Sequence, residues 1–157
     1  MLRLIRKRMK GEKGFTLIEL LVEIIIIAIP TFLGQRQKAQ DAAAKSLVRN
    51  AMTAIATSYV DNQTYLPTTI TPAVLLAIEP SITFKVVATA ATTAAISASA
   101  TDGPKTVPQT VDYDGTATVY DIAVTSASGN QFGVYVDTAG AGETFVKKIG
   151  STFSTGW

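Results

Sequence analysis

Two carboxylates lie four residues apart within the apolar sequence FTLIELLVEIIIIAIP, which covers residues 15–30. They are Glu19 and Glu23. A charged side chain at membrane depth is costly in free energy and is usually retained for a function. In a helix, positions i and i+4 share one face, where two like charges disfavour the helix by a few tenths of a kcal/mol. This pair is therefore the first candidate for a functional site.

Side chains suited to catalysis are scarce. The chain has no Cys and no His, which removes disulfides, thiolate nucleophiles, the commonest zinc ligand and any Ser-His dyad. Asp112 and Asp114 in the sequence VDYDG are conceivable as an acid pair, but we interpret this sequence as a turn before a strand. No clustered Asp/Asn loop for Ca²⁺ is present. We expect no enzyme activity, no metal site and no cofactor, and a hydrolase is disfavoured.

Charge is unevenly distributed along the 157 residues, although the net charge is only +2. Residues 1–59 contain ten Lys or Arg and four acids, whereas residues 60–157 contain four Lys and eight acids. Removing residues 1–14 takes away six positive charges and one negative charge, so the net charge changes from +2 to −3. Nucleic acid is thus a possible partner that the sequence does not indicate.

The N-terminal arrangement is that of a targeting signal. Residues 1–14 are basic and end in Gly14, and an apolar run follows from Phe15 to Leu33. As a helix this run spans roughly 28 Å, close to the hydrocarbon thickness of a bilayer. No Ala-x-Ala-like cleavage site follows Pro30. We therefore expect a cut before the apolar run, with the basic flank cytoplasmic and the rest of the chain outside.

A long helix is predicted from residue 15 to about residue 61. Its first half is apolar all round, and its second half has one apolar stripe at helical spacing, formed by Leu47, Val48, Ala51, Met52, Ile55 and Tyr59. Pro30 cannot donate a backbone hydrogen bond, so a helix break or weak point is expected between Pro30 and Gly34.

The remaining sequence predicts a loop, a short helical turn at residues 72–78 and a strand near Phe84. Residues 88–110 are rich in Ala, Thr and Ser, and we interpret them as a small-residue loop or weak edge strands, with a glycosylated surface as the alternative. The clearest strands alternate around Ile122 and Val134, with turns at SASGN and AGAGE. The predicted fold class is α+β, with the helix packed on an antiparallel sheet of three or four strands.

The sequence GFTLIEL, residues 14–20, resembles the type III signal of type IV pilins and pseudopilins. The later sequence IAIPTFLGQRQKAQDAAAKS, residues 27–46, resembles the stretch around the helix-breaking proline of that family. The resemblance covers roughly residues 10–60, and the remainder resembles the family only in architecture. It implies the pilin fold and a division into a leader peptide (1–14), a transmembrane and assembly helix (15–34) and a globular domain (35–157). Within that domain we expect a helix (35–61), an αβ loop (62–115) and the antiparallel sheet (116–157).

The resemblance also implies roles for individual residues. Gly14 would be the last leader residue recognised by a prepilin peptidase, and Phe15 would become the N-methylated N-terminus. Glu19 would pair with the amine of Phe15 in a neighbouring subunit, and Pro30 with Gly34 would mark the helix break. In low dielectric a charge pair costs far less than an isolated charge.

The chain departs from the family pattern in two places. Only fifteen residues run from Phe15 to Ile29, as though about two turns were missing. Glu23 stands where an aliphatic residue is expected, and it is interpreted either as an incidental substitution or as a second contact between subunits.

We expect a structural subunit that is stored in the cytoplasmic membrane with its C-terminus outside, and that then polymerises into an extracellular type IV pilus. Its expected partners are copies of itself in a helical filament, the prepilin peptidase and methylase, the membrane and the pilus assembly machinery. One alternative is a pseudopilin of a secretion or DNA-uptake system. Another is a membrane-tethered adhesive or binding module that never polymerises.

Overall fold

The computed structural model describes residues 16–87, 109–140 and 142–157. The chain divides into two compact units, Met1–Arg36 and Gln37–Trp157. The long helix α2, Leu17–Asn62, contributes to both of them. The segments 1–14, 15–34 and 35–157 were predicted on functional grounds, and as functional segments they stay predictions.

Within the first unit, all described side chains from Thr16 to Arg36 are exposed. The helix is continuous through Pro30 and Gly34, so the predicted break is absent from this structure. A proline removes one backbone hydrogen bond, and the intact turns on both sides maintain the helix around that single gap. The hydroxyl of Thr31 also donates to the carbonyl oxygen of Ile27 at 3.1 Å. A role for Pro30 and Gly34 as a weak point during assembly stays a prediction.

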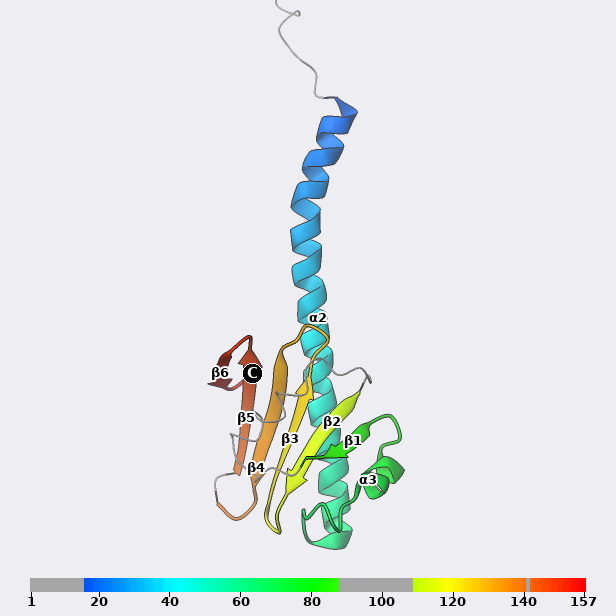
Figure 1. Ribbon diagram of the computed structural model, residues 1–157, viewed down its shortest axis with the longest axis vertical. Coiled ribbons are helices and arrows are strands. Elements are labelled where there is room, and N and C mark those ends of the chain that lie inside the picture. The colour runs from blue at the N-terminus through cyan, green and yellow to red at the C-terminus, as the bar shows by residue number, and fades with distance from the viewer. Residues whose placement is uncertain (1–15, 88–108, 141) are drawn as a thin grey trace, which may run out of the picture. The chain divides into compact units, whose positions relative to one another are not determined.

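The second unit is an α+β domain, as the sequence predicted. The second half of α2 lies along one face of a six-stranded sheet in the order β1 to β6 (Figure 1). The strands are β1 (Thr83–Val86), β2 (Thr110–Gly115), β3 (Val119–Thr125), β4 (Gln131–Asp137), β5 (Gly142–Ile149) and β6 (Thr152–Thr155). Strands β1 and β2 are parallel, and each later neighbour is antiparallel.

The sheet is larger than the predicted three or four strands. Strand β1 matches the predicted strand near Phe84, whereas β2 lies within residues 62–115, which the prediction assigned to a loop ahead of a sheet that began at residue 116. Asp112 and Asp114 lie in strand β2, so their interpretation as a turn was wrong. Pairing with β1 and β3 outweighs the low strand propensity of Asp and Gly. The region 88–108 lies outside the described residues.

The short helix was predicted correctly. Helix α3, Pro72–Ile78, begins behind the N-cap residue Thr71, whose side chain accepts a hydrogen bond from the backbone N–H of Val74. Pro72 occupies the first helical turn, where its missing N–H has no helical partner to lose. Leu75 of α3 is fully buried and joins the core of the second unit.

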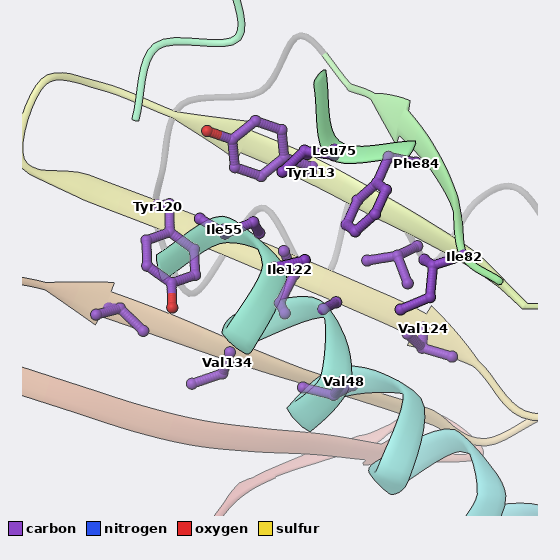
Figure 2. Close-up of a cluster of buried hydrophobic side chains, with 14 of the residues drawn as sticks. Val48, Ile55, Leu75, Ile82, Phe84, Tyr113, Tyr120, Ile122, Val124 and Val134 are labelled. Atoms are coloured by element: carbon purple, nitrogen blue, oxygen red, sulfur yellow. The ribbon is translucent and has the colours of Figure 1, made fainter. Parts of the chain in front are cut away.

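The core forms between one face of α2 and the facing side of the sheet. Val48 and Ile55 of α2 point toward Ile122 and Val134 of the sheet (Figure 2), and all four side chains are fully buried. The other buried residues of α2 follow the same stripe and are Ala44, Ala51, Ala54 and Ser58. Full burial of one such aliphatic side chain stabilises a fold by about 1.5–3 kcal/mol. This helical stripe therefore fixes the helix against the sheet.

A polar contact also joins α2 to the turn between β3 and β4. The carboxylate of Asp41 accepts a hydrogen bond from the hydroxyl of Ser128 and another, at 2.9 Å, from the side-chain amide of Asn130. The turn itself is closed by a bond of 2.7 Å from the N–H of Ser126 to the carbonyl oxygen of Asn130. The predicted turn SASGN is thus both present and fixed to the helix.

The face of the sheet away from α2 carries a buried carboxyl group. Asp121 of β3 is 5% exposed, and its Oδ1 has no hydrogen-bond partner within the described part of the chain. It lies directly across from Asp114 of β2. Burial, and secondarily the nearby Asp114, raise the pKa of Asp121 from 3.8 to about 8. Folding therefore favours the protonated form of this side chain.

We expect stability to fall as pH rises because of Asp121. Between pH 4 and pH 8 the folded state holds a proton on this carboxyl that the unfolded state has lost, so the free energy of unfolding decreases as pH increases. Since each unit of pKa difference corresponds to about 1.4 kcal/mol, Asp121→Asn should be the more stable protein at pH 8.5 and should match the wild type near pH 4. Urea unfolding of residues 35–157 at several pH values measures this. Asp61→Asn, at an exposed position, is the control, and a wild-type-like pH profile for Asp121→Asn would contradict the assignment.

Candidate functional site

The candidate site begins with the first turn of α2, where Thr16 and Glu19 bond to each other. The backbone N–H of Glu19 donates to the hydroxyl oxygen of Thr16 at 3.2 Å. In return, the backbone N–H and the hydroxyl of Thr16 both donate to Oε2 of Glu19 at 3.1 Å. This reciprocal pattern is a capping box, which satisfies N–H groups that the start of a helix leaves without partners. The negative charge of Glu19 also suits the positive end of the helix dipole.

Thr16 was not among the residues predicted to form the site. The signal was present in the spacing Thr-x-x-Glu immediately before an apolar helical run, which is the signature of a capping box. The consequence for Glu19 is geometric. Both hydrogen bonds of its side chain within the described residues end on Oε2, which fixes the side chain and leaves Oε1 available to an incoming group.

Glu19 and Glu23 line the same groove on the side of α2, as the i and i+4 spacing predicted. The groove has a volume of about 480 Å³, and its other lining residues are Ile18, Val22, Ile26 and Ile27. A second groove on this part of the helix, of 620 Å³, contains no acid and is lined by Ile24, Ile27, Ala28, Thr31, Phe32 and Gln35. Both carboxylates are therefore gathered on one side of the helix.

The surface around these carboxylates is strongly apolar. Leu17 is 80% exposed and Ile18 74% exposed. An 18-residue window of α2 has a mean hydropathy of 2.3, so this helix is long and apolar enough to cross a membrane. An exposed apolar surface of this kind marks a site of contact with lipid or with another protein.

Two further residues of the predicted site, Gly14 and Phe15, lie outside the described residues. Their roles in cleavage and methylation therefore stay predictions, as does the pairing of Glu19 with a neighbouring amine. Among the residues that the structure describes, no group of three or more His, Cys, Asp or Glu could hold a metal ion.

Comparison with protein families identifies a prokaryotic N-terminal methylation motif at residues 9–29. This motif supports a type IV pilin-like protein with a type III signal. The motif spans the predicted leader junction and the apolar start of the helix, including both Glu19 and Glu23. No match was found among curated proteins or among solved structures.

The motif also bears on the processing, assembly and membrane anchoring of this chain. It implies processing by a prepilin peptidase and a pilin-type assembly system, and it suggests a structural protein instead of an enzyme. Together with the apolar helix it fits anchoring in a membrane before assembly. The arrangement of a long N-terminal helix against a sheet fits a pilin as well.

Proposed function

We propose that this chain is a pilin, a structural subunit that polymerises into an extracellular type IV pilus after leader removal and N-methylation. The observation that carries the proposal is the exposed apolar half of α2, which begins with the capping box of Thr16 and Glu19 and overlaps the methylation motif. A membrane-tethered binding module would need an apolar anchor, but it would need neither the Gly14–Phe15 junction nor Glu19.

The apolar half of α2 allows the subunit to pass from the membrane into a filament. In the membrane its side chains contact lipid, and in a filament they would contact the equivalent helices of neighbouring subunits. Neither state exposes the apolar surface to water, so a subunit can leave the membrane without the large cost of hydrating that surface. The globular unit, which has its own core, remains outside and forms the surface of the filament.

Pairing of opposite charges would set the register between neighbouring helices in the filament. No Lys or Arg occurs between Phe15 and Gln35, so the α-amine created by cleavage is the one cation that the mature sequence places in its apolar segment. An isolated charge in a low-dielectric environment is expensive, and pairing it with an opposite charge removes much of that expense. Glu19 is a suitable partner because it is already oriented by Thr16.

Electron microscopy of sheared surface fractions tests the proposal. We expect filaments that contain this chain, with an intact mass corresponding to a protein that begins at a methylated Phe15. Processed protein that stays cell-associated and forms no surface filaments would favour a pseudopilin. Full-length, unprocessed protein in cells that make a prepilin peptidase would contradict the proposal.

Gly14→Trp is expected to block leader removal and to leave the full-length chain in the membrane. The reason is that the peptidase must accommodate the small residue before the cut, and a large indole at that position obstructs the approach. Intact-mass measurement of the membrane fraction detects the retained leader. Gly34→Trp is the matched control, because a side chain at Gly34 meets open space and lies far from the junction in sequence. Normal cleavage of Gly14→Trp would contradict the assigned processing site.

A further inference from the structure

Glu23 is the carboxylate of the apolar helix that the proposed function leaves without a role. It lies one helical turn beyond Glu19 and lines the same groove. A charge on an otherwise apolar surface disfavours membrane insertion, and a second like charge on the same face also disfavours the helix. An aliphatic residue at this position would avoid both penalties. A compensating contact in the assembled state would offset both penalties.

Glu19 by itself offers a limited contact to an incoming cation. Its Oε2 already accepts both donors of Thr16. This leaves Oε1 as the acceptor that faces no donor of the described residues. The side chain of Glu23 makes no hydrogen bond within the described part of the chain, so its two oxygens are available on the same groove.

The chemistry of the expected ligand matches this arrangement. A singly methylated α-ammonium group carries two N–H donors and one positive charge. In a dry environment each N–H donor needs an acceptor, because an unsatisfied buried donor is costly. Glu19 can accept one of these bonds and Glu23 the other, and hydrogen bonds between ionised groups are the strong ones.

We propose that Glu19 and Glu23 together form a two-carboxylate seat for the methylated N-terminal ammonium of a neighbouring copy of this chain. Glu19 is the fixed half of the seat, held by the capping box, and Glu23 supplies the second acceptor one turn along the same groove. The aliphatic residues between them, such as Val22, pack against the neighbouring helix and exclude water. This inference rests on the proposed filament function and assigns the partner of Glu23 within it.

Filament yield from Glu23 variants of the full chain tests the seat. Glu23→Gln and Glu23→Val should each reduce the yield by about 10-fold or more, the size expected for one hydrogen bond to a charged group. Leader removal should stay unchanged and the amount of membrane-bound monomer should not decrease, since neither step uses the seat. Glu23→Asp keeps the charge and should recover most of the yield. Glu143→Gln, an exposed carboxylate of the globular unit, controls for the change in net charge.

Solid-state NMR of the filaments gives a readout that a purely structural role of Glu23 would not affect. With ¹⁵N-labelled Phe and ¹³C-labelled Glu, the N-terminal nitrogen should show contacts to two side-chain carboxyl carbons in the wild type and to one in Glu23→Gln. Wild-type yield from Glu23→Val, or a single carboxyl contact in wild-type filaments, would overturn the inference. Failure of the proposed function is distinguishable, because the processed wild-type chain would then form no filaments at all.

Discussion

The globular unit carrying Ile55→Asp is expected to be unfolded. Ile55 has no exposed surface, and it packs between α2 and the apolar face of the sheet. An aspartate there would either bury an unpaired charge or force the helix away from the sheet, and both are strongly destabilising. Loss of the buried side chain alone costs about 2–5 kcal/mol, a large part of the typical 5–15 kcal/mol stability of a domain. Circular dichroism and thermal unfolding of residues 35–157 measure the effect.

Val60→Asp is the matched control for this experiment. It makes the same kind of change on the same helix, but Val60 is 70% exposed, so the unit should keep its native spectrum. A native spectrum and an unchanged melting temperature for Ile55→Asp would show that the core is not formed as described. A wild-type 35–157 fragment that stays disordered would instead contradict the division into an apolar segment and an independent domain.

The second large effect is expected for Glu19→Ala, which should abolish filaments or reduce them severely. Cleavage should be unaffected and membrane insertion should not be impaired, because the monomer in the membrane does not use the intersubunit pair. Glu19 lies near the end of the apolar segment, so removal of its charge should favour insertion by less than the roughly 3 kcal/mol expected for a charge at the centre. Filament yield measured beside membrane-bound monomer separates assembly from these earlier steps.

The capping box makes a further control necessary, because Glu19→Ala also removes a helix cap. Thr16→Ala disrupts the same cap, at a cost of about 1 kcal/mol, but leaves the carboxylate of Glu19 in place. Filaments should therefore persist in Thr16→Ala at a reduced yield. Normal filaments from Glu19→Ala would refute the pairing, and equal losses in both variants would show that the cap and not the charge is what assembly requires.

Much of the fold could be predicted from periodicity. The helical stripe containing Val48 and Ile55 and the alternation around Ile122 and Val134 both reflect one-sided burial, which leaves a clear pattern in the sequence. Strand β2 was not predicted, because its residue types and its alternation point to different structures. Asp112 and Asp114 alternate with Val111 and Tyr113 as in a strand, but Asp and Gly are typical of turns, and only the neighbouring strands decide between the two.

The buried state of Asp121 was equally inaccessible to sequence reasoning. Strand β3 is buried on both faces from Tyr120 to Val124, whereas an alternating strand predicts a solvated outer face.

The candidate site, too, was predictable from the sequence only in part. The junction at Gly14 and the position of Glu19 follow a specific local motif, which the family comparison supports. The bond between Glu19 and Thr16 depends on side-chain geometry, which the motif alone does not specify.

The contact between Asp41 and the β3–β4 turn has a mechanical consequence. Asp41 accepts bonds from two residues of the same turn, Ser128 and Asn130, so a tensile load on this part of α2 is shared between two attachments. That turn connects the two central strands of the sheet, and their ladder of backbone hydrogen bonds resists shear collectively. In a fibre under tension, Asp41 would therefore transmit force from the helix into the middle of the sheet, away from its weaker edges.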